Sequence, residues 1–337
     1  MLGRPEGVSP VPHTRRAGAL SLSTSSGRRP SKRASHALRQ AQGTSEELRN
    51  WLLRGIYRGG WRLAARLPAR LIAVIISVIS WLALRHNGRH VRTLRSNLMQ
   101  TTGAPVGEDL VRAALASYLR AFYEVLALPD WSETEIRFRV TAVNEAAVRE
   151  AHAGPGAIVA LPHSGNWDLA GAWACVTGMP VTTVAEQLPD REFADFVAFR
   201  EGLGLQVLSH RDPGVLAALV EAIQRRRVVC LLADRDLTGT GVPVAWRGLP
   251  ITMPAGPAIL ARRTGATLLP AVCQFTERGM VIIIGDRVMP RPGRAGLVAM
   301  MQEVADFFSE TIARQPEDWH MMQPFFVDHA TPAEEAR

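Results

Sequence analysis

Short apolar runs alternate with amphipathic stretches through the second half of the chain. The apolar runs cover 157–161, 181–185, 205–209, 228–233, 267–275 and 280–285. Residues with helical spacing of apolar positions cover about 167–177, 190–202, 213–225, 254–264 and 295–313. Continuous apolar runs of this length are typical of strands that are buried on both faces. The alternation therefore predicts an α/β fold with a mixed, mostly parallel sheet flanked by helices.

Upstream of these runs the pattern is more helical. Leu110, Val111, Ala114, Leu115 and Tyr118 begin a series with helical spacing that predicts one amphipathic helix over 107–128. A short strand at 138–140 and a short helix at 144–152 are expected before the first apolar run.

A basic and apolar segment precedes this part of the chain. Arginines at 54, 58, 62, 66 and 70 recur every four residues, so they form one stripe on a helix, with Trp51, Tyr57 and Trp61 between them. A basic stripe opposite an apolar and aromatic face is typical of a helix that lies in a membrane interface.

The next stretch, LIAVIISVISWLAL at 71–84, is wholly apolar except for its serines and is followed by further arginines. Fourteen residues of helix rise about 21 Å, less than the ~30 Å of a hydrocarbon core. Three interpretations stay open: a helix dipped into one leaflet, which we favour, a single span that begins near 63, and a buried helix of a soluble protein.

Charge is divided unevenly along the chain. Residues 1–100 hold 17 Arg and one Lys against three Glu, a balance of +15, whereas the remainder holds 21 Arg against 28 acidic residues, a balance of −7. The basic part suits an anionic lipid surface. Nucleic acid is a weaker interpretation, because aliphatic residues separate the charges and no nucleic-acid-binding motif accompanies them.

Residues 1–44 are rich in Ser, Arg, Pro and Gly and lack apolar periodicity. This composition predicts a disordered tail. The segment also lacks the apolar core and the small-residue cleavage site of a secretion signal.

Candidate chemistry begins at LPHSGNWD, where His163 and Asp168 follow the apolar run at 157–161. Ligands of open α/β sheets gather beyond the carboxyl ends of the strands. A histidine there can act as a general base, and a carboxylate on its second nitrogen would fix its tautomer. Ser164 and Asn166 are good helix caps, so the amides of 165–167 are candidate oxyanion donors. The spacing alone favours a capped turn without chemistry over a catalytic pair.

Other reaction classes find little support in the sequence. The remaining histidines have no metal-ligand spacing with His163, so no metal site is predicted. No G-x-S-x-G occurs, which disfavours a serine hydrolase, and no phosphate-binding glycine loop indicates a nucleotide. The three cysteines are far apart and lack a CxxC pair, which fits a reducing compartment.

Two further polar groups follow predicted strands. Asp234, Arg235 and Asp236 come directly after the run at 228–233, on the same predicted edge of the sheet as His163. A carboxylate there could support His163 and Arg235 could hold an oxyanion, whereas the simpler interpretation is a solvated, self-paired loop. Glu186 follows 181–185 and Arg200 ends the next predicted helix; each is either a site residue or a surface charge.

Several blocks in order resemble one known family. PHSGNWD, ADRDLTGTGVPVAWRG and MPAGPAILARRTGATLLP resemble the bacterial membrane acyltransferases that include the late acyltransferases of lipid A and the phosphatidylinositol mannoside acyltransferases. The resemblance covers roughly 47–327, and VAEQL, FVAFRE and ADRDL place the chain nearer to the mannoside branch.

The resemblance implies a glycerophosphate-acyltransferase-like fold with N-terminal membrane-associated helices. It divides the chain into a tail (1–44), membrane-associating helices (45–100), an acyltransferase domain (101–329) and a last tail (330–337). It implies palmitoyl transfer from acyl-CoA to a mannose hydroxyl, with His163 as base and Asp168 as its partner. Asp234 falls at a position where glutamate is usual, in support of the histidine. Glu186, Arg200, Arg235 and Asn166 are the expected substrate-binding residues.

The resemblance further implies a peripheral or monotopic protein on the cytoplasmic face of the cell inner membrane, in contact with anionic lipid. No cofactor beyond the co-substrate acyl-CoA, no metal and no nucleic-acid partner is expected. The alternatives that stay open are a lipid A-type or lysophospholipid acyltransferase, and a non-catalytic lipid-binding protein with the same fold.

Overall fold

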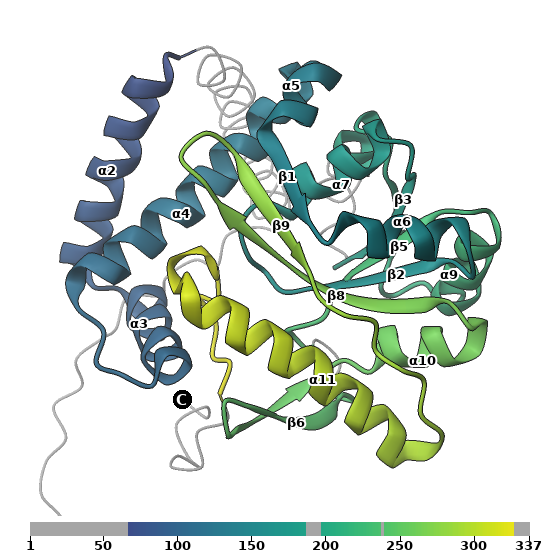
Figure 1. The fold of residues 1–337 in the computed structure, drawn as a ribbon. Coiled ribbons are helices and arrows are strands. Elements are labelled where there is room, and N and C mark those ends of the chain that lie inside the picture. The colour runs from purple at the N-terminus through teal and green to yellow at the C-terminus, as the bar shows by residue number, and fades with distance from the viewer. Residues whose placement is uncertain (1–66, 187–196, 237–238, 327–337) are drawn as a thin grey trace, which may run out of the picture. The chain divides into compact units, whose positions relative to one another are not determined.

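The centre of the molecule is a sheet of seven strands in the order β1-β9-β8-β2-β5-β3-β4 (Figure 1). The structure is a computed structural model that describes residues 67–186, 197–236 and 239–326, all within one compact unit, Gly59–Arg337. The strands are β1 (Val140–Val143), β2 (Ala157–Leu161), β3 (Val181–Ala185), β4 (Gln206–Ser209), β5 (Val228–Leu232), β8 (Thr267–Phe275) and β9 (Met280–Ile284).

Strand direction divides this sheet into two groups. β8, β2, β5, β3 and β4 run parallel to one another, whereas β9 is antiparallel to β8, and β1 is parallel to β9. The expected mixed, mostly parallel sheet is therefore confirmed. Every residue of β2 is buried, as its unbroken apolar run requires.

Helices cover both faces of the sheet and bury a separate core against each. The helices are α4 (Glu108–Ala127), α5 (Glu133–Arg139), α6 (Glu145–Ala153), α7 (Trp167–Val176), α9 (Val215–Gln224), α10 (Gly256–Thr264) and α11 (Gly293–Arg314), with 3-10 turns η1 (Leu128–Asp130) and η2 (Pro316–Asp318). One core joins Ile158 and Ala160 of β2 to α9, α10 and α11. The other joins Val159 and Leu161 to α5, α6 and α7.

The N-terminal described segment forms two helices, α2 (Ala69–His86) and α3 (Arg89–Thr102). α2 starts directly after Pro68 and ends at Asn87, which takes a left-handed conformation. Figure 1 shows α2 lying along α4, and α3 shares a small core with α4 through Leu94, Leu98 and Val111. Among the described helices none is long and apolar enough alone to cross a membrane; α2 and α3 pass that test only together, with a 93° bend between them.

Two local predictions were wrong. Residues 133–139 form α5, started by a Ser132–Glu135 capping box, so the strand expected at 138–140 begins only at Val140. The segment expected as a loop before α10 contains a hairpin, β6 (Val242–Trp246) and β7 (Leu249–Met253). Its two-residue turn, Arg247–Gly248, has both φ angles positive, at 49° and 86°.

The basic helix expected over 46–66 and both tails lie outside the described residues. So does most of the predicted helix at 190–202, of which the structure describes only the end that carries Arg200.

Candidate active site

Two adjacent strands bring His163 and Asp234 together. β2 and β5 are parallel neighbours, with Leu161 opposite Leu232. His163 and Asp234 each lie two residues beyond those partners, so both side chains emerge at the same edge of the sheet. This is the edge at which parallel α/β sheets bind ligands.

Asp234 holds His163 through both its ring and its backbone. His163 Nδ1 lies 2.6 Å from Asp234 Oδ1, and the His163 amide donates to Oδ2 over 2.8 Å. The Asp234 side chain is fully buried, whereas 22% of the His163 side chain is exposed. With Nδ1 engaged by the carboxylate, the proton stays on Nδ1 and the Nε2 lone pair is the one available to a substrate.

Asp234 is ionised despite its burial. Burial raises the pKa of Asp234, but the His163 charge, the hydrogen bonds from His163 and the bond from Trp319 outweigh it, so that the pKa lies below its usual value of 3.8. The pair therefore consists of a buried carboxylate and a histidine oriented by it.

Asp168 does not take the position expected from the sequence. Its two carboxylate oxygens receive Arg200 Nε at 2.5 Å and Arg200 Nη2 at 3.0 Å. Both side chains are buried, and in the described part of the chain no hydrogen bond joins Asp168 to His163. The structure thus corrects the predicted contact, because Asp168 is the second residue of α7 and faces Arg200, 32 positions along the chain.

Asn166 caps α7. Its side-chain oxygen accepts from the Leu169 amide over 3.0 Å, and its Nδ2 lies 3.3 Å from Glu124 Oε2. Asn166 is 1% exposed, and both polar atoms of its side chain have a hydrogen-bond partner within the protein.

Two of the backbone amides that were expected to receive an oxyanion already have hydrogen-bond acceptors within the protein. The Gly165 amide donates to Asp318 O over 2.9 Å, and the Asn166 amide points at Met280 Sδ at 3.4 Å. Gly165 has φ +54°, and a Cβ there would lie 2.7 Å from Cys273 O, so the turn needs glycine to pack against β8. Of the residues proposed as oxyanion donors, the Trp167 amide and Arg235 remain.

The other expected site residues lie near the same edge without joining the pair. Arg235 is half-buried and makes no hydrogen bond or ion pair with another described residue. Asp236 accepts from the amides of Gly239 and Gly241, as in a self-paired loop. Glu186 is exposed at the end of β3. Within the described ranges, no group of three or more His, Cys, Asp and Glu could hold a metal ion.

A C-terminal segment completes the site, and the sequence pattern did not indicate it. Trp319 Nε1 donates to Asp234 Oδ2 over 3.2 Å, and the His320 amide donates to His163 O over 2.8 Å. The signal was slight: a polar and aromatic DWH triplet follows the last helix, and His320 has no metal-ligand spacing with His163.

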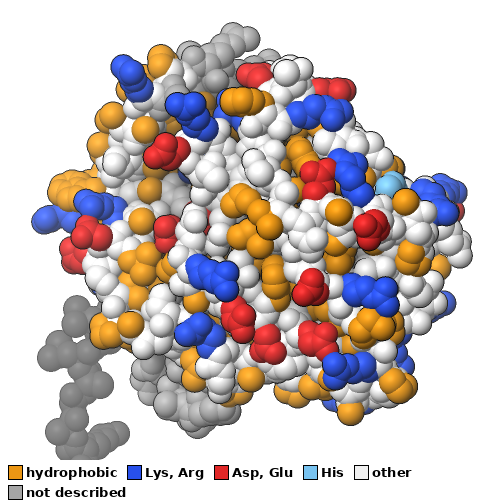
Figure 2. Space-filling view, viewed as in Figure 1, with side chains coloured by type: hydrophobic (Ala, Val, Ile, Leu, Met, Phe, Trp, Pro, Cys, Tyr) orange, Lys and Arg blue, Asp and Glu red, His pale blue; other side chains and the backbone are white. Residues whose placement is uncertain are grey.

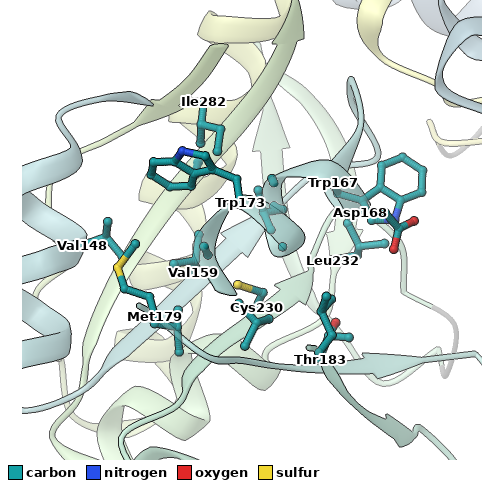
Figure 3. A pocket seen from close by; sticks show the side chains of 18 of the residues that line it. Val148, Val159, Trp167, Asp168, Trp173, Met179, Thr183, Cys230, Leu232 and Ile282 are labelled. Carbon is teal, nitrogen blue, oxygen red and sulfur yellow. The ribbon is translucent and has the colours of Figure 1, made fainter. Parts of the chain in front are cut away.

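A narrow apolar cavity runs from this edge between the sheet and α7. The volume of the cavity is ≈ 70 Å³. Figure 3 shows Trp167 and Asp168 at one end, Cys230 and Val159 along it, and Val148 and Met179 at the other end. Asp168 and Arg200 are the charged residues of a lining that is otherwise almost entirely apolar. This apolar lining suits a hydrocarbon group.

The chain is similar in sequence to known acyltransferases. The model of the family described as bacterial lipid A biosynthesis acyltransferase matches residues 40–327. A phosphatidylinositol mannoside acyltransferase of Mycolicibacterium smegmatis is 41% identical over 255 residues, which cover 72% of this chain and 82% of that protein. A protein of the same name from Mycobacterium tuberculosis (strain CDC 1551 / Oshkosh) is 42% identical over 256 residues, or 71% of this chain and 78% of the relative.

Proposed function

The chain belongs to the bacterial lipid A biosynthesis acyltransferase family and is an acyltransferase, and from this premise we propose its substrates and mechanism. The donor is a long-chain acyl-CoA, palmitoyl-CoA in the first instance. The acceptor is a mannose hydroxyl, O-6, of a phosphatidylinositol mono- or dimannoside. The names of the relatives support the acceptor, and the cavity supports a long acyl chain.

The single observation that carries the chemistry is the His163–Asp234 pair. His163 Nε2 removes the proton from the mannose hydroxyl while that oxygen attacks the thioester carbonyl. The C–O bond forms, the C–S bond breaks, and the proton leaves with CoA as its thiol. Asp234 stabilises the imidazolium that forms in between, and Arg235 or the Trp167 amide receives the oxyanion.

The acyl chain occupies the cavity between the sheet and α7. The end of the cavity that Trp167 lines is beside His163. The Trp167 and His163 rings meet edge to face with 5.4 Å between their centroids. A thioester carbonyl at this end would therefore lie near Nε2, with the hydrocarbon directed toward Val148 and Met179.

Membrane contact is assigned to α2. Apolar side chains are exposed along it: Leu71, Val74, Ile75, Val78, Ile79, Trp81 and Leu82. Figure 2 shows hydrophobic side chains at the edge of the molecule formed by α2, beside basic ones. An exposed apolar helix face with arginines nearby suits the cytoplasmic surface of an anionic inner membrane. Co-sedimentation with phosphatidylinositol vesicles that is unaffected by Val74→Glu/Val78→Glu would contradict this assignment.

The proposed function is tested with the purified protein, labelled palmitoyl-CoA and a panel of acceptors. A phosphatidylinositol monomannoside should be acylated, whereas a lipid A precursor and a lysophospholipid should not. His163→Asn keeps a donor for Asp234 and removes the base, so the rate should fall by about 10²–10⁴-fold. Full transfer by His163→Asn would refute the mechanism, and preference for another acceptor would refute the substrate.

A further inference from the structure

Asp234 receives a hydrogen bond from a residue 85 positions away in the chain, Trp319. We propose that Trp319 is a positioning residue for the reaction, which fixes the Asp234 carboxylate so that Asp234 can orient His163. This inference rests on the proposed role of His163 as general base.

The two oxygens of Asp234 have different partners. Oδ1 lies 2.6 Å from His163 Nδ1, whereas Oδ2 accepts from the His163 amide at 2.8 Å and from Trp319 Nε1 at 3.2 Å. Donors on Oδ2 resist rotation of the carboxylate, and such rotation would move Oδ1 out of line with the imidazole. Asp234 is 0% exposed, so water cannot replace a donor that is lost.

Trp319 is itself rigidly held. Its side chain is fully buried, stacks on Trp246 with 5.3 Å between ring centroids, and meets Phe325 edge to face at 4.8 Å. Ser164 forms a β-bridge with Trp319, and the neighbouring residues on each side bond to the same turn: Asp318 O accepts from Gly165, and His320 N donates to His163 O. The indole and the turn that carries His163 are therefore fixed to each other.

Trp246 provides a control within the same aromatic cluster. It is as buried as Trp319 and is stacked on it, but in the described part of the chain its Nε1 has no hydrogen-bond partner. Replacing either tryptophan by phenylalanine removes a similar volume from the cluster. Only Trp319→Phe also removes a donor from Asp234.

The experiment compares Trp319→Phe and Trp246→Phe in the full-length protein, each alone and combined with Asp234→Asn. Trp319→Phe should lower kcat by about 10-fold, with the KM values for both substrates unchanged. Trp246→Phe should keep kcat within about 3-fold of the unsubstituted protein, although both variants lower the melting temperature. When Asp234→Asn is already present, Trp319→Phe should lower kcat by only about 3-fold or less, because the carboxylate charge that Trp319 positions is absent.

Equal losses of kcat in Trp319→Phe and Trp246→Phe would overturn the inference, since both would then reflect packing. A loss that persists in full with Asp234→Asn would overturn it as well. Failure of the proposed function is distinguishable, because it appears as full activity of His163→Asn, whatever the tryptophan variants do.

Discussion

Two buried carboxylates lie close to His163 in the sequence or in space, and each has a different basic partner. Asp234 contacts His163, while Asp168 and Arg200 form a two-bond ion pair in which the side chains are only 5% and 8% exposed. A buried ion pair contributes little net stability, but removing one member leaves an unpaired buried charge. Asp168 and Asp234 should therefore fail in different ways when their charges are removed.

Asp168→Asn should destabilise the protein by about 3–5 kcal/mol, because it removes the buried carboxylate charge that accepts two hydrogen bonds from Arg200. The double substitution Asp168→Leu/Arg200→Met should recover part of that loss, since it removes both charges of this pair. Urea denaturation of the single and double variants measures the difference. If Asp168→Asn were fully stable yet lost activity as severely as Asp234→Asn, Asp168 would have to act on His163 in some other conformation.

His320 makes the stability of the protein depend on pH. Burial, and secondarily the charge of His163, lower the pKa of His320 from 6.5 to about 3. As the pH falls, His320 therefore takes up a proton at a higher pH in the unfolded chain than in the folded protein. The free energy of unfolding keeps the full contribution of neutral His320 above about pH 6.5 and loses it progressively as the pH drops toward 3. The slope of the unfolding free energy should approach about 1.4 kcal/mol per pH unit from this group.

The variant His320→Gln isolates that contribution. A glutamine amide can replace His320 Nε2, which lies 3.0 Å from Ser117 Oγ, but it does not titrate. Stability measured by denaturation at pH 7, 6 and 5 should fall less steeply in the variant than in the unsubstituted protein. Parallel pH dependences would mean that other groups are responsible, for example His152, whose pKa burial also lowers.

At the scale of elements, the sequence predicted those structures whose signal is local. The strands that carry His163 and Asp234 are apolar runs, and their shared edge follows from the parallel arrangement. The pairing of Asp168 with Arg200 could not be predicted, because it depends on how α7 turns its first residues and on a partner 32 positions away. The hairpin β6–β7 was missed because Pro243 and Pro250 argue against strands, although the alternation around Arg247–Gly248 was present.

The cavity lined by α7 and the sheet predicts a dependence on acyl-chain length. Cys230 lies part of the way from Trp167 to Met179 (Figure 3), so Cys230→Phe should block the far part of the cavity. Activity with palmitoyl-CoA should fall by more than about 10-fold while octanoyl-CoA stays a substrate, with a cost in stability of about 1–3 kcal/mol from overpacking. Steady-state rates with the two donors measure the shift.

Cys230→Ala is the matched control, since it changes the same side chain without filling the cavity. It should keep the order of preference of the unsubstituted protein. Equal losses with both donors in Cys230→Phe, at a temperature where the variant is folded, would show that the acyl chain lies elsewhere.

At the scale of the whole molecule, the two ends of the described chain meet behind the active site. Asn97 of α3 donates from Nδ2 to Met321 O and Gln323 O, each over 2.8 Å. Ser117 of α4 donates to Asp318 Oδ1 over 2.5 Å. The helices α3 and α4 thus hold the segment whose Trp319 and His320 contact Asp234 and His163. Contacts that span more than 200 residues leave no periodic signal, which is why the sequence did not reveal them.

This connection predicts that a substitution in α3 lowers the catalytic rate. Asn97 is 2% exposed, and Asn97→Leu removes the donor to the carbonyl of buried Met321 and to that of exposed Gln323, which should cost about 1–3 kcal/mol of stability. Because the freed segment carries Trp319, kcat should also fall by several-fold with unchanged KM. Gln100→Leu on the same helix should not lower kcat, because among the described residues the Gln100 amide donates only to Ser96 Oγ, at 3.3 Å. Calorimetry and acyl-transfer kinetics well below the melting temperature check both effects. An Asn97→Leu variant that is destabilised but keeps its full kcat would show that α3 supports the fold without influencing the geometry of His163 and Asp234.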